Sequence, residues 1–494
     1  MIIIMTMTTK EMMTMMMTNK AILALVILLT LNTHTVYADD WLELVQKYTS
    51  ADKINFAPSK WDKLINESSG RKDKNINILA QWWETFNDPT LTELIGRAFA
   101  NNKDIQTSRA KVQEARAQLG LSMADASPRV DGSGTWTHSE PSKNIPNAGS
   151  SNNYHLGFDA SWELDLWGKK QDNINASKAA YEAEYASLHN AWVSLSAEVA
   201  GNYINLRTFQ ERIKIAENNI NLQQDMLNLT QSQFDAGLKD ELAVKQSRYT
   251  LERTKSTLPA LRQQIEEIMN ALAILTGEVP GSINELLNNN NSFPEVDVNR
   301  LNGIPAETIR QRPDIIAAER NLAAQRSRKK AAQKDYYPTI TLTGSIGLDS
   351  LHSSTIFEGH SIGSTFLPRL SWPIFNGGQI RKNIKVQTAR EEQMLAAYEK
   401  TVLSAVSEVR NALTSNVQEE IRNQSLQSAL NSAHDALNTA RDKYEQGLTD
   451  FNSVLNAMES VNSIENDLAS SNGQRMLNLI TLFKALGGGW QPMM

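Results

Sequence analysis

Residues 154–164 read Tyr-His-Leu-Gly-Phe-Asp-Ala-Ser-Trp-Glu-Leu and decide the fold. Leu156, Phe158 and Ala160 alternate with polar or small residues, the period-two pattern of a strand with one apolar face. The run is about ten residues long, which is the length that a tilted transmembrane β-strand requires. The stretch therefore predicts a strand with one face toward lipid.

Three further stretches complete a set of four strands. Arg129–Thr137 is expected to begin a strand, and a polar loop at Ser139–Asn153 separates it from Tyr154–Leu164. Thr339–Leu348 and Ser364–Phe375 repeat this plan later in the chain. Backbone polar groups inside lipid must all be paired, so strands cross a membrane only as a closed barrel. Four strands cannot close around a pore, whereas three copies supply twelve. This arithmetic predicts a trimer.

The strands belong to an internal duplication with a single offset of 210 positions. Two copies are fewer than a solenoid needs, so we expect a pseudo-symmetric pair within one protomer, completed by oligomerisation. Each copy reads helix, two strands, long helix, glycine turn, long helix. The matches include Asp104-Ile105 with Asp314-Ile315, Pro128 with Pro338, Ser161-Trp162 with Ser371-Trp372, Gly168 with Gly378, and Gly237-Leu238 with Gly447-Leu448.

Long helices are expected on both sides of the strands. The first helix of copy one should run from Pro89 to about Ala126, and the long helix from about Lys170 to Phe234 contains no proline. At 1.5 Å per residue, the long helix is a rod of roughly 100 Å. Its apolar residues recur at steps of three and four, which predicts a coiled-coil seam. The seam comprises Tyr181, Tyr185, Leu188, Trp192, Leu195, Val199, Tyr203, Leu206, Phe209, Ile213, Ala216 and Ile220.

Returning helices at Asp240–Thr276 and Asp450–Leu486 are expected to pack back along the rods, and Pro259 should kink the first of them. The Asn-rich stretch Asn288–Asn291 is interpreted as the linker between the copies. A basic cluster at residues 326–330 predicts a solvated face or contacts between protomers.

The N-terminal part predicts export. The apolar run Ala21–Leu31 is too short to span a bilayer, and Val36-Tyr37-Ala38 predicts cleavage after Ala38. No later window approaches ~18 consecutive apolar residues, so no membrane-spanning helix is expected. The predicted domains are a signal peptide (1–38), an N-terminal periplasmic segment (39–88), repeat one (89–279), a linker or equatorial segment (280–298), repeat two (299–488) and a tail (489–494).

Composition excludes several classes of protein. The 494 residues carry 49 Lys+Arg against 55 Asp+Glu, a net charge of −6, which argues against a basic nucleic-acid-binding surface. The chain has no cysteine, which excludes disulfides, thiolate zinc sites, Cys nucleophiles and Cys-linked lipid anchors. The seven histidines form no His-Glu-x-x-His motif. We therefore expect no catalytic site, no metal and no cofactor.

Several motifs together resemble the TolC-like outer membrane factors, in the branch that serves RND-type tripartite multidrug efflux pumps. The resemblance covers about Trp82 to Gly488. Many members of this branch carry a lipid on an N-terminal cysteine, and no such anchor is expected here. The motifs are Trp82-Trp83-x-x-Phe86-x-Asp88-Pro89-x-Leu91, Arg312-Pro313-Asp314-Ile315 with Glu319, and the corners Trp162-Glu-Leu-Asp-Leu-Trp-Gly168 and Trp372-Pro-Ile-Phe-Asn-Gly-Gly378.

The resemblance implies a mixed α/β membrane protein of the Gram-negative outer membrane. Its expected form is a homotrimer with a twelve-stranded transmembrane β-barrel, four strands per protomer, continuous with a long periplasmic α-helical coiled-coil barrel. The helical tips would meet a periplasmic adaptor (membrane fusion) protein coupled to an inner-membrane RND-type pump. Such a duct catalyses no reaction and passively conducts drugs or other small molecules to the outside.

Two glycine turns join the paired helices, where a glycine takes the left-handed cap conformation. The resemblance makes these tips the adaptor-docking surface, with Leu238 and Leu448 as exposed apolar knobs. The docking set is Phe234, Gly237, Leu238, Lys239, Tyr444, Gly447, Leu448 and Thr449.

A periplasmic constriction is expected at Asp450, Ser453 and Asn456, just past the second tip. Ser453 and Asn456 match positions where some relatives place aspartate rings that close the tunnel and bind cations. Here both are uncharged, so a solvated helix face is an equal alternative, and Asp450 could form a weaker charged ring.

The barrel–helix junction set is Trp162, Gly168, Trp372, Gly377 and Gly378. Both tryptophans are expected to end strands. Their aromatic rings fit either a membrane-interface girdle or packing at the junction. The glycines are expected to relieve crowding where strand becomes helix.

Three other functions are weighed against this one. A same-fold alternative is the outer membrane channel of a type I protein-secretion or metal-ion efflux system, because substrate identity resides mainly in the inner-membrane partner. A trimeric adhesin or pore-forming toxin does not predict a duplicated strand pair plus helical hairpin. A hydrolase would need a nucleophile–base constellation, and none is present in the sequence.

Overall fold

The computed structural model describes residues 79–142, 144, 149–238, 240–288, 293 and 306–490. All of these belong to one compact unit, Ser69–Met494. The predicted signal peptide, residues 39–78 of the N-terminal segment, Lys239, residues 289–292 and 294–298 of the linker and the last four residues lie outside the described part.

The first half of the described chain is helix, strand pair and long helices, as expected. Four strands are present in the described residues, two in each half of the chain. The elements of the first half are η1 (Trp82–Phe86), α5 (Pro89–Asn101), α6 (Lys103–Ala124), β1 (Arg129–Ser139), β2 (Ser151–Leu164), α7 (Lys169–Asp235), α8 (Glu241–Lys255), α9 (Thr257–Leu275) and α10 (Asn284–Leu287).

The second half follows the same plan. Helix α12 begins 210 positions after α7, and both helices have 67 residues. The elements are η3 (Ala306–Gln311), α11 (Pro313–Gln333), η4 (Lys334–Tyr336), β3 (Thr339–Ser350), η5 (Gly359–Ser361), β4 (Ile362–Ser371), α12 (Gln379–Glu445) and α13 (Phe451–Ala485).

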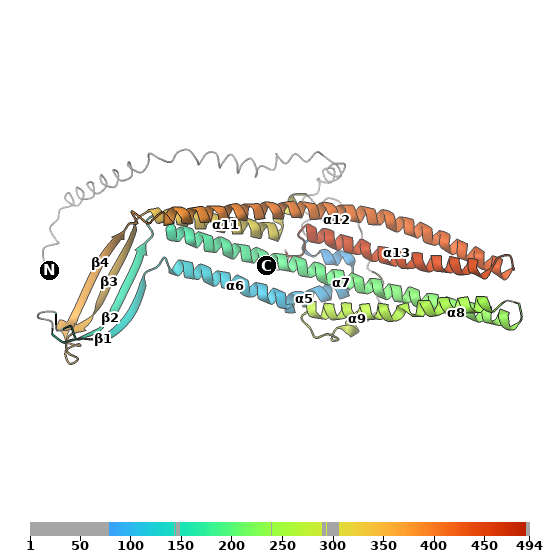
Figure 1. Ribbon diagram of the computed structural model, residues 1–494, viewed down its shortest axis with the longest axis horizontal. Coiled ribbons are helices and arrows are strands. Elements are labelled where there is room, and N and C mark those ends of the chain that lie inside the picture. The colour runs from blue at the N-terminus through green and yellow to red at the C-terminus, as the bar shows by residue number, and fades with distance from the viewer. Residues whose placement is uncertain are drawn as a thin grey trace, which may run out of the picture. The chain divides into compact units, whose positions relative to one another are not determined.

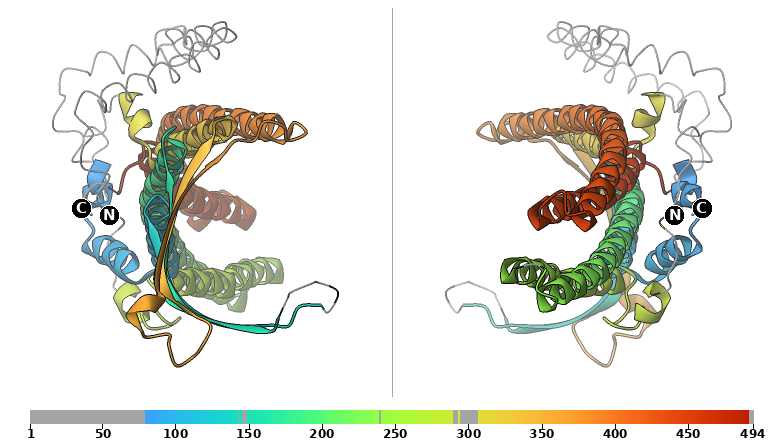
Figure 2. Two further views of the ribbon diagram at one scale, coloured as in Figure 1. Left: turned by 90° about the vertical axis from the view of Figure 1, so that its left-hand side faces the viewer. Right: turned by 90° about the vertical axis from the view of Figure 1, so that its right-hand side faces the viewer.

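The strands form one antiparallel sheet in the order β1-β2-β3-β4. It lies at one end of the long helices, and the glycine turns lie at the other (Figure 1). Helix α7 packs against α6 and α11 near the sheet and against α8, α9 and α13 farther away, while α12 packs against α11 and α13. Viewed end-on, sheet and helices follow one curve that is open on one side (Figure 2).

Two predicted boundaries were wrong, each for a local reason. The helix expected from Pro89 to Ala126 is two helices, because the Asn102 side chain accepts hydrogen bonds from Asp104 N and Ile105 N and caps α6. The first returning helix is interrupted at Ser256, as expected from Pro259, because the proline ring clashes with the carbonyl four residues before it. Strand β4 ends at Ser371, since Pro373 lacks a ladder donor.

The main core joins the start of the described chain to its end. The Trp82 ring stacks on Phe483 of α13 at 5.2 Å, and both side chains are fully buried. Trp83 and Phe86 meet Trp82 edge-on, at 5.9 Å each. A smaller cluster lies toward the tips and contains Met226, Ala243, Tyr444, Phe451, Val454 and Met458.

The predicted coiled-coil seam of α7 is buried over its middle part, Leu188 to Leu206. Its first residues differ, since the Tyr185 side chain is exposed. In α12 only three residues are buried, namely Ala405, Ala412 and Tyr444. Large apolar side chains such as Leu403 and Ile421 are left in contact with water on this helix.

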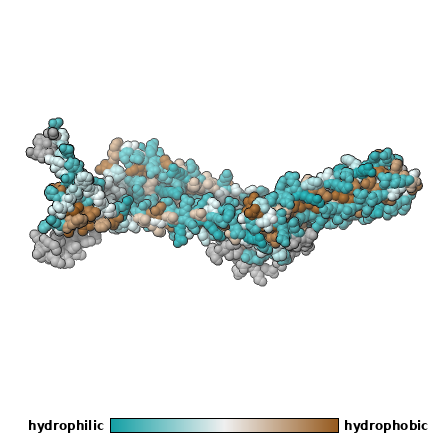
Figure 3. All heavy atoms as spheres, turned by 90° about the horizontal axis from the view of Figure 1, so that it is seen from below, coloured by the Kyte–Doolittle hydropathy of each residue, from teal (hydrophilic) through white to brown (hydrophobic). Residues whose placement is uncertain are grey.

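In the described part of the chain, no helix has the length and apolar character that a membrane span requires. Apolar residues gather around the strands and in a stripe along the helical end that carries the tips (Figure 3).

Candidate functional site

The strand register gives the sheet one apolar and one polar face. Between neighbouring strands the even-numbered residues lie opposite even-numbered ones, for example Phe158 opposite Gly132 and Ile346. Even positions carry no Asp, Glu, Lys or Arg in any of the four strands. This face also carries the uncharged polar residues His138, Asn152, Ser350 and Ser364 near the strand ends. Its other members are Val130, Gly132, Gly134, Trp136, Tyr154, Leu156, Phe158, Ala160, Trp162, Ile340, Leu342, Gly344, Ile346, Leu348, Ile362, Phe366, Pro368 and Leu370.

The odd-numbered face carries every charged group of the strands. Asp131 lies opposite Asp159, and Arg129 pairs with Asp131 at 2.8 Å. Across β2 and β3, His155 Nδ1 lies 2.9 Å from Asp349 Oδ1. A sheet with apolar side chains on one face and solvated ones on the other can line water on one side and contact lipid on the other.

The sheet-to-helix junction is held by two equivalent hydrogen bonds. Trp162 Nε1 donates to Ala126 O at 2.9 Å, and Trp372 Nε1 donates to Tyr336 O at 3.1 Å. Each bond ties the end of the second strand of a pair to the chain just before the first strand. The contacts favour the packing role that the sequence left open for these rings. Trp162 lies in β2, whereas Trp372 lies one residue beyond β4.

The junction glycines all have a left-handed backbone. Gly168 and Gly378 cap α7 and α12 with φ of 72° and 83°, and Gly377 has φ of 60°. A Cβ on Gly377 would meet no atom within 4 Å, whereas one on Gly168 would lie 3.1 Å from Lys334 Nζ. The left-handed backbone favours glycine at all three positions, and the expected crowding is present at Gly168 only.

Replacing Trp372 by Phe should remove the bond to Tyr336 O while keeping the ring. We expect a loss of about 1 kcal/mol of stability, the typical net value of one hydrogen bond. Thermal unfolding of the purified protein measures it. Trp136→Phe is the matched control, because that indole makes only a 3.4 Å bond to Asn152 Oδ1. An equal effect of the two substitutions would contradict the junction role.

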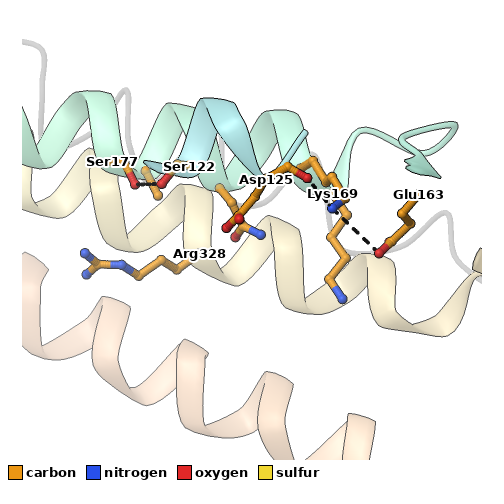
Figure 4. Close-up of a pocket in the computed structure, with 9 residues that line it drawn as sticks. Ser122, Asp125, Glu163, Lys169, Ser177 and Arg328 are labelled. Atoms are coloured by element: carbon orange, nitrogen blue, oxygen red, sulfur yellow. Dashed lines mark hydrogen bonds and ion pairs between the residues drawn. The ribbon is translucent and has the colours of Figure 1, made fainter. Parts of the chain in front are cut away.

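A cavity of about 430 Å³ lies beside the first junction, between α6, the end of β2, α7 and α11 (Figure 4). Ser122 and Ser177 are hydrogen-bonded at 2.7 Å on its wall, and Arg328 reaches it from α11. Lys170 Nζ donates to Asp125 O at 2.6 Å and lies 3.7 Å from Glu163 Oε2. Most of the charged side chains that line the cavity thus already have partners within the chain.

The basic cluster at residues 326–330 is partly used within the chain. Arg326 Nε and Lys329 Nζ contact the two carboxylate oxygens of Glu391 on α12, at 3.2 and 2.9 Å. Arg326 and Lys329 are half-buried and Arg328 and Lys330 are exposed, so the cluster is in part the solvated face that was expected, and contacts between protomers stay a prediction.

The helical tips have the predicted glycine caps. Gly237 and Gly447 have φ of 72° and 75°, and the next residue donates back into the helix in both turns. Leu238 and Leu448 are 72% and 70% exposed, as expected of apolar knobs. Lys239 lies outside the described residues.

The other predicted tip residues are divided between surface and interior. Phe234 is exposed, whereas Tyr444 is buried and donates from its hydroxyl to Gln233 Oε1 at 2.8 Å. Burial raises the pKa of the Tyr444 hydroxyl. Thr449 is half-buried and donates to Ser453 Oγ at 3.0 Å. Tyr444 thus links the two hairpins instead of presenting its ring to a partner.

Asp450 is the N-cap of α13. The Ser453 hydroxyl and backbone N–H donate to Asp450 Oδ1 at 2.8 and 3.0 Å, and these bonds hold the pKa of the carboxyl below its usual range. Asn456 is exposed two turns into the helix. Asp450 therefore stays charged at neutral pH, and Ser453 is its cap partner.

Acid should weaken this cap. A carboxyl whose folded pKa is depressed contributes stability above its unfolded pKa, and the contribution is lost as the pH falls through the folded pKa. We expect thermal unfolding to shift downward below about pH 4 in the natural protein. Asp450→Asn should shift less over the same range, because Asn caps helices without titrating. Identical pH profiles would contradict the capping role.

Within the described residues, no group of three or more His, Asp or Glu side chains could hold a metal ion.

The His189 ring stacks on the Trp192 and Trp490 rings, at 5.5 and 4.7 Å between ring centres, and its burial lowers the pKa of the imidazole.

Two buried polar networks were not predicted from the sequence. Tyr203 OH donates to Asp88 Oδ2 at 2.5 Å and accepts from Arg207 Nε at 3.0 Å. Arg312 donates to Asp314, to Glu408 Oε2 at 2.8 Å and to Ala485 O at 2.7 Å. In the second network only Asp314 is close to Arg312 in sequence, within the Arg-Pro-Asp motif. The other two partners, Glu408 and Ala485, are remote in sequence.

Comparison with known proteins decides the family. The model of the family described as outer membrane efflux protein matches residues 94–278 and again residues 304–488. The chain belongs to the outer membrane efflux protein family. This confirms the resemblance, and the protein is an outer membrane efflux channel with a periplasmic helical part.

Several relatives of this efflux protein are similar along most of their length. The cation efflux system protein CusC of Escherichia coli O6:H1 is 31% identical over 414 residues, covering 83% of this chain and 89% of CusC. Outer membrane protein OprJ of Pseudomonas aeruginosa is 30% identical over 435 residues, covering 87% and 90%. The structure of the outer-membrane channel OprN has a TM-score of 0.80 and 32% identity, over 84% of this chain and 93% of OprN.

Proposed function

We propose that three copies of this chain form the exit duct of a tripartite efflux pump. Their strands close a twelve-stranded barrel in the outer membrane, and their helices form a tunnel across the periplasm. The observation that carries the proposal is the two-faced sheet, which has all its strand charges on one face and none on the other. The apolar face contacts lipid and the charged face lines an aqueous path.

Open edges support the trimer. β1 and β4 each have a single neighbour within the chain, and an unpaired edge cannot remain in lipid. Helix α12 carries exposed Leu403 and Ile421, 68% and 55% accessible. Neighbouring copies would cover both the strand edge and this helix.

The partners are a periplasmic adaptor and an inner-membrane pump of the RND type. The two tips present equivalent knobs, Leu238 and Leu448, and these are the natural contacts for an adaptor. Both side chains are more than two-thirds exposed, so a partner can bury them without any rearrangement of the chain. The helices behind the tips, including Asp450, Ser453 and Asn456, narrow the periplasmic mouth, and threefold symmetry makes each of these residues a ring.

The substrate class has two candidates. Passive conduction of drugs or other small organic molecules follows from the branch of the family that the motifs resemble. Export of metal ions is the second candidate, because the relative CusC is named a cation efflux system protein. In either case the duct supplies the path and the inner-membrane partner supplies the energy and the choice of substrate.

Deletion of the gene tests both candidates at once. The strain should be hypersensitive to antibiotics and dyes if the cargo is organic, and to salts of metal cations if the cargo is a cation. A plasmid copy should restore resistance in either case. Unchanged susceptibility to both panels, together with loss of a secreted protein, would favour a type I secretion system instead.

A further inference from the structure

The two hairpins of the sheet differ at their outer ends. The helices are periplasmic, so the hairpin loops, at the opposite end of the strands, lie toward the outside (Figure 1). In the first hairpin the apolar face ends on an aromatic pair, because the Trp136 and Tyr154 rings stack with 6.4 Å between their centres. Aromatic side chains form girdles at both borders of the lipid-facing band in membrane barrels.

The second hairpin has no aromatic residue at this level. Tyr154 lies opposite Ser350, at the end of β3. The last apolar pair of the second hairpin is Leu348 opposite Ile362, two residues closer to the helices. Two residues correspond to about 7 Å along a strand, or about 5 Å of height in a tilted barrel strand. The lipid-facing band would therefore stop short on this side if the strands alone formed it.

The β3–β4 loop, residues 351–361, carries the apolar surface that the second hairpin lacks. It contains Leu351, Ile356 and Phe357, and Glu358 is its only residue of the types Asp, Glu, Lys and Arg. The side chains of Leu351 and Phe357 are 62% and 79% exposed. The loop thus presents two large apolar side chains that the rest of the chain does not cover.

Hydrogen bonds within the loop hold it in a compact turn. Ser350 Oγ lies 2.7 Å from Thr355 Oγ1 and donates to His352 O at 2.9 Å. Ser361 Oγ donates to Thr355 O at 2.7 Å, and Glu358 N donates to the same carbonyl at 3.1 Å. A segment that lies against hydrocarbon needs its backbone polar groups paired in this way. The turn is therefore already formed when it meets a membrane.

We propose that the β3–β4 loop is a membrane anchor, which inserts Phe357 and Leu351 into the outer leaflet of the outer membrane, level with Trp136 and Tyr154. This inference rests on the proposed lipid-facing sheet and extends it beyond the strands. The loop is continuous with the apolar face, because β4 begins directly after it with Ile362, which is 62% exposed on that face. Transfer of such apolar surface from water into hydrocarbon is favourable.

A fluorescent label at position 357 tests the anchor, because the chain has no native cysteine. Full-length Phe357→Cys is labelled with an environment-sensitive fluorophore and reconstituted into phosphatidylcholine vesicles, with and without nitroxide-bearing lipid. The exposed side chain makes few contacts within the chain, so the substitution should spare the fold. Compared with the water control below, we expect the nitroxide lipid to quench this label at least twofold more, and iodide on both sides to quench it at least twofold less.

Two matched variants give the limits of the scale. Leu156→Cys lies on the apolar face within the strands, and its label should be quenched by the nitroxide lipid. Ser142→Cys lies exposed in the polar β1–β2 loop, whose hairpin already ends on an aromatic pair, and its label should be quenched by iodide.

Each outcome supports or overturns the anchor. A label at 357 that behaves like Ser142→Cys, while Leu156→Cys reports lipid, would overturn the anchor and leave the duct standing. A label at 357 that is shielded from both quenchers would also overturn it, because protein and not lipid would then cover the loop. If the Leu156→Cys label is itself open to iodide and not to lipid, the lipid-facing sheet is wrong and the proposed function fails with the anchor.

Discussion

Leu448→Asp is expected to abolish efflux and to make cells as susceptible as the deletion strain. The Leu448 side chain is 70% exposed at a glycine turn, where nothing in the chain requires an apolar group. Burial of a leucine against a partner contributes about 1.5–3 kcal/mol, and an aspartate would forfeit it and add a desolvation cost. A trimer carries Leu448 at three tips, so the binding energy to the adaptor is lost at all three. Growth inhibition by the exported compounds measures it.

Ile274→Asp is the control for this tip variant. Its side chain is 65% exposed at the end of α9, far along the chain from either tip. It should leave resistance intact. Both variants should reach the outer membrane in equal amounts, and only Leu448→Asp should fail to cross-link to the adaptor. Full resistance with Leu448→Asp would contradict docking through the tips.

Phe483→Ala is expected to lower the free energy of unfolding by about 3–5 kcal/mol. The ring is fully buried and stacks on Trp82 at 5.2 Å, so its removal leaves a cavity between η1 and α13. The same ring contact ties the start of the described chain to its end. Denaturant unfolding followed by the helical circular dichroism signal measures the change.

Phe357→Ala provides the reference for the core variant. This phenylalanine is 79% exposed in the loop between β3 and β4, and its truncation should change stability by less than about 0.5 kcal/mol. Similar losses for the two variants would show that Phe483 does not hold the ends of the chain together.

Local sequence patterns predicted the strands and long helices, because apolar residues recur in each of them with a regular period. Alternation in Tyr154–Leu164 found a strand, and threefold and fourfold spacing found the long helices. Gly237 and Gly447 were recognised because few other residues tolerate the left-handed caps that they form. These features depend on neighbours within a few positions, which the sequence displays directly.

Features that depend on tertiary contacts were missed or misread. Asn102 ends one helix and caps the next, but an asparagine within an otherwise helical pattern does not by itself predict that the helix ends there. The positive φ of the junction glycines was not predicted, since φ is not visible in a sequence. Arg312 and Glu408 are 96 positions apart, so their ion pair follows only from the packing of α11 against α12.

Whether three chains make one conducting cylinder is measured by native mass spectrometry of the detergent-extracted protein. We expect a single species of three subunits, each with the 55.1 kDa chain mass less any cleaved leader, that conducts ions across planar lipid films. A monodisperse single subunit that conducts nothing would contradict it.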